Sequence, residues 1–321
     1  MSAMSGIQVR VQRKTAEAQD IVSLELVRAD GGELPAFGAG SHIDVHLPGG
    51  LVRQYSLCNH AAERHRYRIA VLREPRSRGG SAAVHEAVNE GDLLTISAPR
   101  NLFGLQDAPR TLLLAGGIGI TPLLCMAQRL AGWGADFELH YAARSAARTA
   151  FAAEIAASGF AHRVHLHHDD GPDSQKLRCA ELLAQVDGGT HLYVCGPAGF
   201  IYHVVDTAKA QGWPAGQIHT EYFAAPEQDT TGDQPFEVRL ASTGQTWPVA
   251  RDQSIVQALR AQGVEIMVSC EQGVCGTCLT RVLEGVPEHR DLYLTDEEKA
   301  ANDQILPCCA RSKTPLLVLD L

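Results

Sequence analysis

Four cysteines toward the C-terminal end constrain the fold of this chain more than any other feature. Cys270, Cys275, Cys278 and Cys308 have the spacing C-x4-C-x2-C, followed by a gap of 29 residues. A plant-type 2Fe-2S cluster takes four thiolates at this kind of spacing. Zinc motifs usually pair one C-x2-C with a second one or with histidines, and neither arrangement follows here. The spacing therefore predicts a domain that folds around an iron–sulfur cluster, with these four cysteines as its ligands.

The residues around these cysteines suit a tight loop. Gly273 and Gly276 lie between the first three cysteines, and glycine tolerates positive φ and close backbone approach. Cys309 directly follows Cys308 and is the alternative fourth ligand, but the 29-residue gap favours Cys308. Three further cysteines have no partner at ligand spacing and are expected to be small buried side chains: Cys58, Cys125 and Cys179.

Length and charge narrow the class of protein. A chain of 321 residues suggests two or three domains. The formal net charge is −9, and no block of lysine or arginine occurs, so we expect no binding to nucleic acid or to anionic membranes. No apolar stretch reaches the roughly 18 residues that a transmembrane helix needs, and no apolar signal core follows Met1. Nine cysteines then indicate thiolates rather than disulfides, and we expect a cytoplasmic protein that is monomeric when free.

Two patterns of periodicity divide the rest of the chain. Residues 1–105 contain short alternating runs separated by turn signals such as Pro48-Gly49-Gly50, which predicts an antiparallel β-barrel with strands near 21–27, 42–47, 54–57, 67–72 and 93–96. Across residues 106–225, apolar runs alternate with helical patterns, including 122–130 and 176–185, which predicts a parallel α/β sheet. Residues 226–235 are polar and predict a linker. Residues 236–321 form the cysteine-bearing domain of mixed α and β pattern.

Two turns in the predicted α/β domain suit a nucleotide. Gly117, Gly119 and Thr121 lie in a turn that follows a buried strand and opens a helix, where free N–H groups favour a diphosphate. Cys195 and Gly196 end a later strand of the same sheet. Ligands of such sheets lie at the carboxyl ends of the strands, so the two turns predict one site. On its residues alone, the first turn is explained equally well as a tight turn without a ligand.

A strand of the predicted barrel carries a second candidate site. In the run Arg53, Gln54, Tyr55 and Ser56, the arginine and the tyrosine share one face while the serine lies on the other. A ring beside a guanidinium suits a flat cofactor with a phosphate. Periodicity alone favours the alternative of an ordinary strand with an exposed arginine.

A short predicted helix at 82–88 offers a further phosphate cradle. Gly80 and Ser81 precede it, and they supply backbone amides and a hydroxyl group.

The order of these motifs resembles the phthalate dioxygenase reductase family along the whole chain. The motifs are the strand that carries Arg53 and Tyr55, the Gly79-Gly80-Ser81 turn, the turns at Gly117 and Cys195, and the C-terminal cysteines. The resemblance implies a flavin-binding β-barrel, an NADH-binding α/β domain and a plant-type ferredoxin domain of the β-grasp fold. Members of this domain order use FMN. The resemblance also implies electron transfer from NADH through FMN and the 2Fe-2S cluster to a separate Rieske-type terminal oxygenase, as in vanillate demethylase reductases.

The resemblance also assigns roles to single residues. Arg53, Gln54, Tyr55 and Ser56 are expected at the flavin, with Gly80 and Ser81 at its phosphate, while Gly117, Gly119, Thr121 and Gly196 are expected at the nucleotide. Cys195 is expected near the nicotinamide and Phe223 over the flavin ring, the two positions closest to the reacting atoms. His165, His167 and His168 precede an acidic pair and could suggest a metal, but the resemblance favours packing or contact with NADH.

Two other functions stay open on the sequence. One is reduction of a different one-electron acceptor, such as a ferredoxin or a diiron hydroxylase. The other is a redox-sensing or electron-carrying subunit without turnover, against which the intact nucleotide turn argues.

Overall fold

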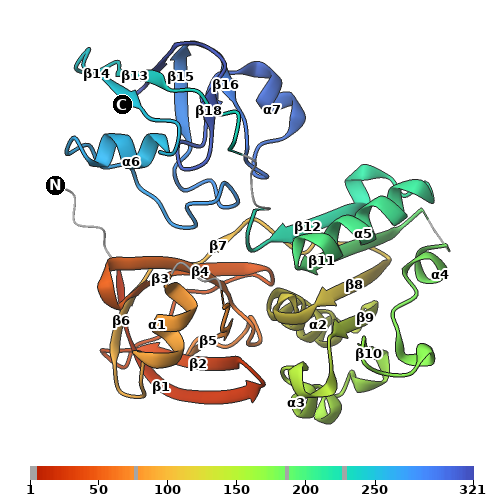
Figure 1. Cartoon of the computed structure of the whole chain (residues 1–321). Coiled ribbons are helices and arrows are strands. Elements are labelled where there is room, and N and C mark those ends of the chain that lie inside the picture. The colour runs from red at the N-terminus through yellow and green to blue at the C-terminus, as the bar shows by residue number, and fades with distance from the viewer. Residues whose placement is uncertain (1–5, 76–78, 185–187, 226–229) are drawn as a thin grey trace. The chain divides into compact units, whose positions relative to one another are not determined.

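The computed structural model describes residues 6–75, 79–184, 188–225 and 230–321 (Figure 1). By its backbone contacts the chain divides into two compact units, Met1–Glu221 and Tyr222–Leu321, which are described separately. Within the described ranges, no helix has the length and apolar character needed to cross a bilayer. Residues 226–229 of the predicted linker lie outside these ranges.

The first unit begins with the predicted antiparallel barrel. Its strands are β1 (Ile7–Ala18), β2 (Ile21–Arg28), β3 (Ser41–Leu47), β4 (Leu51–Ser56), β5 (Tyr67–Leu72), β6 (Leu93–Ile96) and β7 (Arg100–Asn101). They pair in the order β4-β3-β6-β1-β2-β5, with β7 on β3. The two ends of this order, β4 and β5, come within 8 Å between Cα atoms, so the sheet curls back on itself. Helix α1 (Gly80–Glu86) lies beside it.

Alternation along the strands explains why the barrel closes around a core. In β1, Val9 and Val11 are 0% and 1% exposed, whereas Arg10 between them is exposed. Successive side chains of a strand point to opposite faces, so one face of β1 is buried and the other meets solvent. In β2, Leu24 and Leu26 are fully buried in the same core.

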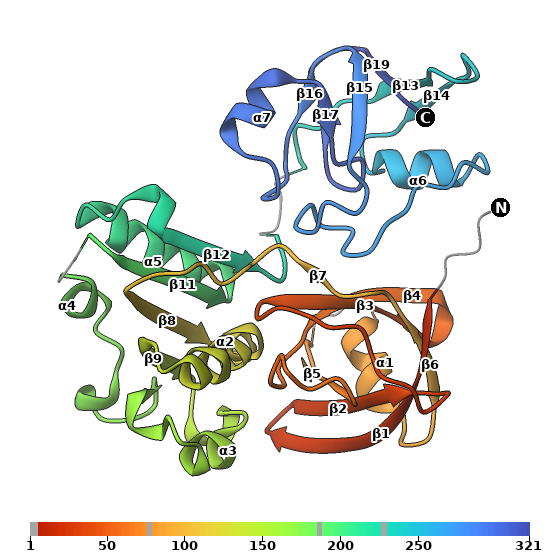
Figure 2. The same ribbon diagram turned by 180° about the vertical axis from the view of Figure 1, so that it is seen from behind.

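The predicted parallel α/β sheet follows. Its strands are β8 (Arg110–Gly116), β9 (Asp136–Ala143), β10 (Val164–His168), β11 (Thr190–Gly196) and β12 (Ile218–Tyr222), in the order β10-β9-β8-β11-β12. The pairs β10/β9, β9/β8 and β8/β11 are parallel. The helices are α2 (Ile120–Trp133), α3 (Ala152–Ala157), α4 (Cys179–Leu183) and α5 (Ala198–Ala210), and Figure 2 shows the same sheet from behind.

One predicted helix is wrong in its extent. The pattern at 176–185 predicted a helix of ten residues, but α4 spans only Cys179–Leu183. Lys176 is extended, with ψ 143°, because it closes a separate 3-10 turn at Asp173–Gln175. Gln185, at the end of the predicted helix, lies outside the described residues.

Barrel and α/β sheet share one apolar core within the first unit. The buried cluster that contains Leu123 and Met126 of α2 also contains Cys58 and Ala70 of the barrel. Arg68 of β5, 8% exposed, adds an ion pair from its Nη1 to Oε2 of Glu154 in α3, at 2.6 Å. Through these contacts the barrel, which carries Arg53, packs against the α/β sheet, which carries the turns at Gly117 and Cys195.

The second unit has the β-grasp fold. Its strands are β13 (Phe236–Leu240), β14 (Thr246–Val249), β15 (Thr280–Glu284), β16 (Pro287–Glu288), β17 (Gln304–Ile305), β18 (Arg311–Ser312) and β19 (Leu316–Leu319), and its helices are α6 (Ile255–Arg260) and α7 (Asp296–Ala301). The main sheet has the order β14-β13-β19-β15-β17, with β13 and β19 parallel at its centre. Ser254 begins α6 with a capping box, and Ile255 and Leu259 of that helix enter the core.

Candidate functional site

The first part of the candidate site lies where β4 passes the start of α1. A Cβ on Gly80 would lie 2.6 Å from Cγ of Arg53, so only a glycine lets the arginine side chain cross the helix start. Gly79, just before it, has φ +87°, a backbone conformation that favours glycine. Ser81 accepts a hydrogen bond from the Glu74 N–H at 3.1 Å, which leaves its own hydroxyl proton for another acceptor. Arg53, Gly80 and Ser81 are therefore neighbours.

The next residues of β4 fit a bound flavin. The Nε2 atom of Gln54 is buried without a hydrogen-bond partner among the described residues. A buried donor without a partner costs about 1–3 kcal/mol, so this amide suits a ligand oxygen. Tyr55 shares the Arg53 face; burial raises the pKa of its hydroxyl, and the Arg53 charge opposes that shift. The ring is thus a neutral apolar surface beside a cation, which fits a flavin with its phosphate.

We expect Arg53→Ala to weaken flavin retention. A charge-assisted hydrogen bond to a phosphate contributes roughly 1.5–3 kcal/mol, and its loss should let flavin leave during dialysis. The flavin-to-protein absorbance ratio before and after dialysis measures the loss. Arg10→Ala, at an exposed position of β1, is the matched control and should keep its flavin. An unchanged ratio in Arg53→Ala would remove this arginine from the flavin site.

The glycines of the nucleotide turn have different roles. Gly117 has φ +54°, and a Cβ there would meet nothing within 4 Å, so it borders open space. A Cβ on Gly119 would instead lie 2.2 Å from the Cys195 carbonyl oxygen and 2.6 Å from the Gly196 nitrogen. Position 119 therefore requires glycine because its backbone packs against the backbone of Cys195 and Gly196. The Thr121 hydroxyl donates to the Ile118 carbonyl at 3.1 Å, inside the turn.

Glu221 is a residue of this region that the sequence motifs did not single out. Its Oε2 accepts a hydrogen bond from the Ser56 hydroxyl at 3.2 Å. Burial raises the pKa of Glu221 to about 8, and the Ser56 hydrogen bond only partly opposes this shift. Cys195 is fully buried, and its pKa is raised by burial and then by the nearby Glu221 charge. Ser56 of β4 and Cys195 of β11 therefore both lie close to the carboxyl group of Glu221.

The sequence feature that could have identified Glu221 is its position. A carboxyl near the end of the last strand of the α/β sheet is expected at the edge where such sheets bind ligands. Phe223 follows β12 and is 38% exposed. It belongs to the second unit, and its expected place over the flavin stays a prediction.

In the second unit the four predicted ligands come together. Cys270, Cys275, Cys278 and Cys308 are 7%, 7%, 3% and 8% exposed. The thiol of Cys270 interacts with those of Cys275 and Cys308, and the thiol of Cys278 interacts with that of Cys308. The Cys308 contact is also the main reason that the pKa of Cys278 is lowered. One buried group of four thiols is the donor set that a 2Fe-2S cluster requires.

The loop that carries three of these cysteines depends on its glycines. Gly273 and Gly276 have φ +74° and +67°, and a Cβ on Gly276 would lie 2.3 Å from the Tyr293 ring. Backbone N–H groups point at the sulfurs: Gln272 N lies 3.3 Å from Cys270 Sγ, and Thr277 N lies 3.5 Å from Cys275 Sγ. Such N–H···S contacts stabilise thiolates and tune the potential of a cluster. The backbone N–H groups of this loop, like its cysteines, therefore suit a 2Fe-2S cluster.

Asp233, a residue of the predicted linker, is part of the second unit. It is 6% exposed, and its carboxylate pairs with Arg290 at 2.6 Å and Arg311 at 3.3 Å. These three side chains line a cavity of about 400 Å³ that also reaches Cys308 and Cys309. The polar segment therefore ends, structurally, before Asp233.

Two protein families match separate parts of the chain. Residues 238–313 match a family described as the 2Fe-2S iron–sulfur cluster binding domain. Residues 99–218 match a family described as the N-terminal domain of dimethylamine monooxygenase subunit DmmA-like proteins. The first match covers all four predicted cluster ligands, and the second covers both nucleotide turns.

Whole-chain relatives are similar from end to end. Vanillate O-demethylase oxidoreductase of Pseudomonas sp. is 57% identical over 316 residues, which cover 98% of this chain and 100% of the relative. Phthalate dioxygenase reductase of Burkholderia cepacia is 38% identical, over 98% of this chain and 97% of the relative. The solved structure of a phthalate dioxygenase reductase, described as modular for electron transfer from pyridine nucleotides to 2Fe-2S, matches with a TM-score of 0.79 and 38% identity, over 99% of this chain and 98% of that one.

Proposed function

The chain belongs to the phthalate dioxygenase reductase family, and on that premise we propose that it supplies electrons to a Rieske-type oxygenase that demethylates vanillate or a closely similar methoxylated aromatic acid. It is the reductase component of a multicomponent oxygenase and an NADH-dependent oxidoreductase with FMN and a 2Fe-2S cluster. NADH is regenerated in the cytoplasm, where we place the reaction, and we expect a monomer when the protein is free.

The single observation that carries the choice of oxygenase is the gradient of identity. The vanillate O-demethylase reductase of Pseudomonas is 57% identical along its full length, whereas the phthalate dioxygenase reductase of Burkholderia is 38% identical at similar coverage. Reductases of this family share their cofactors, so cofactor binding alone does not account for the additional identity, and a further demand shared with the vanillate relative would account for it. Recognition of the same oxygenase is such a demand.

The residues of the first unit suit the transfer of a hydride. When bound, FMN takes two electrons from NADH and releases them singly, and the 2Fe-2S cluster carries one at a time. Arg53 would neutralise the flavin phosphate, with the Gly80–Ser81 turn beside it, and Gly117 leaves open space for the nucleotide. The pKa of Glu221, about 8, keeps its carboxyl protonated at neutral pH, so no buried negative charge opposes the anionic cofactors.

Cys195 would act through its packing rather than as a nucleophile. Burial raises the pKa of its thiol well above the ordinary value, so the sulfur stays protonated. Cys195 is a small, neutral and fully buried side chain at the end of β11, and its small size would let a nicotinamide ring approach the flavin.

Turnover with purified oxygenase components tests the proposal. We expect NADH-dependent release of formaldehyde from vanillate when this protein is mixed with a vanillate demethylase oxygenase, and much slower turnover with a phthalate dioxygenase oxygenase at equal concentration. NADH-dependent reduction of ferricyanide by this protein alone is the control for an active flavin site. Equal support of both oxygenases, or preference for the phthalate component, would contradict the proposed partner.

A further inference from the structure

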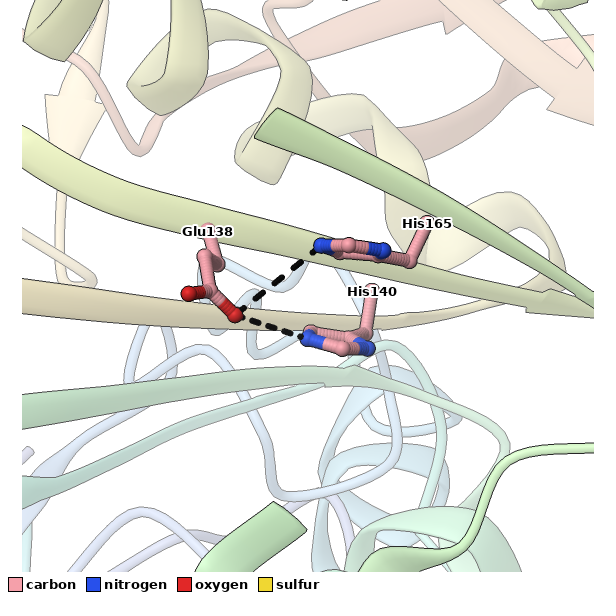
Figure 3. A group of neighbouring side chains, drawn as sticks. All are labelled: Glu138, His140 and His165. Carbon is pink, nitrogen blue, oxygen red and sulfur yellow. Dashed lines mark hydrogen bonds and ion pairs between the residues drawn. The ribbon is translucent and has the colours of Figure 1, made fainter. Parts of the chain in front are cut away.

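A cluster of imidazoles and one carboxylate lies on the α/β sheet, on strands β9 and β10 (Figure 3). Glu138 Oε2 is 3.3 Å from His140 Nε2 and 3.9 Å from His165 Nε2, and these three atoms all lie within 4.8 Å of one another. The strands are parallel, and His140 is paired in register with His165, which brings the two rings together. Their ring centroids are 4.6 Å apart. These three residues lie on other segments than the strand of Arg53, the turns at Gly117 and Cys195 and the cysteine loop.

The hydrogen bonds of this cluster lack one proton. His140 Nδ1 is 3.0 Å from His167 Nε2, and His167 Nδ1 is 3.1 Å from the Gln175 carbonyl oxygen. A carbonyl only accepts, so a neutral His167 donates from Nδ1 and accepts at Nε2, and His140 then donates from Nδ1. A neutral His140 is left with a lone pair on Nε2 that faces the Glu138 carboxylate, which also only accepts.

Two neutral rings supply two N–H groups, but the chain from Gln175 to Glu138 contains three close contacts. A positive species between Glu138 and His140 would complete it. A proton on either ring is one choice, and it would place an imidazolium beside the carboxylate. A metal cation is the other choice, because it binds the bare Nε2 and the carboxylate oxygen together.

We propose that Glu138 Oε2, His140 Nε2 and His165 Nε2 bind a divalent transition-metal ion of the zinc type, which ties the edge strand β10 to β9. Two imidazoles and a carboxylate are a common donor set for Zn²⁺. With bonds of about 2.1 Å at tetrahedral angles, ligand atoms lie about 3.4 Å apart, close to the 3.3 Å and 3.9 Å present. The two rings are stacked with their planes 19° apart, so His165, with 48% of its side chain exposed, would turn to direct its Nε2 lone pair at the ion, and water would complete the coordination.

The surroundings hold the ligands in the required form. His167 accepts from His140 Nδ1, and metal-bound histidines usually donate their second N–H in this way, so His167 is a positioning residue. Arg110 binds the other carboxylate oxygen, Oε1, at 2.8 Å, which leaves Oε2 to face the imidazoles. The Arg110 charge opposes a cation. The Asp136 carboxylate, 3.9 Å from Arg110, offsets part of that charge, although it also pairs with Arg163 at 3.0 Å.

Calorimetric titration of the full-length holoprotein with Zn²⁺ tests this site. We expect one Zn²⁺ per chain, with affinity reduced about 10-fold or more in His165→Gln and in Glu138→Gln. Glu138→Gln is the sharper variant, because its amide N–H can donate to His140 Nε2 and supply the missing proton while removing the carboxylate. His203→Gln, at an exposed position of α5, is the control and should bind like the wild type.

Flavin and iron contents, measured before and after the titration, verify that each variant is folded and that Zn²⁺ has not replaced the cluster iron. A rise in melting temperature with Zn²⁺ in the wild type and in His203→Gln, but not in the two ligand variants, would support the site independently. Absence of Zn²⁺ binding, or binding that His165→Gln and Glu138→Gln leave within 10-fold of wild type, would overturn the proposal.

Discussion

Replacement of Cys308 by serine is expected to remove the 2Fe-2S cluster, whereas replacement of Cys309 by serine should leave it in place. Cys308 is 8% exposed, and its thiol interacts with both Cys270 and Cys278. Cys309 is more exposed, and its sulfur lies near the Leu306 carbonyl at 3.7 Å. A serine oxygen is a poorer ligand for iron than a thiolate, so loss of one true ligand should release the cluster.

Iron content and the visible spectrum of the purified proteins measure this result. We expect two irons per chain in the wild type and in Cys309→Ser, and almost none in Cys308→Ser, with Cys275→Ser as the positive control for cluster loss. The flavin, expected in the first unit, should remain in all variants and shows that the first unit is folded. If Cys309→Ser lost its iron while Cys308→Ser kept it, the fourth ligand would have been assigned to the wrong cysteine.

Features that depend on local spacing were predictable from the sequence. Three cluster cysteines lie in one loop of nine residues, so their spacing alone indicates the cofactor, and the structure adds the close approach of Cys308. The barrel and the α/β sheet followed from periodicities of two residues and of strand–helix alternation, because burial on one face imposes those periods. The length of α4, which has five residues, was overestimated because the helical pattern of the sequence begins at Lys176, whereas the backbone there is extended.

Features that depend on contacts between distant segments were not predictable. Ser56 and Glu221 are separated by 165 positions, and nothing in either segment indicates the other. Glycines at 117 and 119 look alike in the sequence, yet one borders open space and the other avoids a backbone clash with the turn at Cys195. The histidines of β10 were expected to pack or to contact NADH, and only the register with β9 reveals the Glu138 carboxylate beside them.

Removal of the second unit is expected to separate NADH oxidation from delivery of electrons. The first unit has its own apolar core, which joins the barrel to α2, and a chain cut after Gly232 leaves Asp233 with the ferredoxin domain, where it pairs with Arg290 and Arg311. The truncated protein should still reduce ferricyanide with NADH through its flavin. Reduction of cytochrome c and support of the oxygenase should fall to background, because the cluster that carries single electrons is missing.

The full-length Cys275→Ser variant is the matched control, because it lacks the cluster but keeps the surface of the second unit. Between residues 271 and 303 the chain has eight carboxylates against three basic side chains; Asp291 is buried, so seven carboxylates contribute to an acidic excess suited to a basic patch on the oxygenase. Cys275→Ser should therefore inhibit turnover by the intact reductase through competition, with inhibition that weakens as salt shortens the Debye length from about 10 Å at 0.1 M to about 3 Å at 1 M. The truncated protein should not compete. Oxygenase turnover at the full rate by either protein would mean that electrons leave from the flavin, and the cluster would not be the exit point of this reductase.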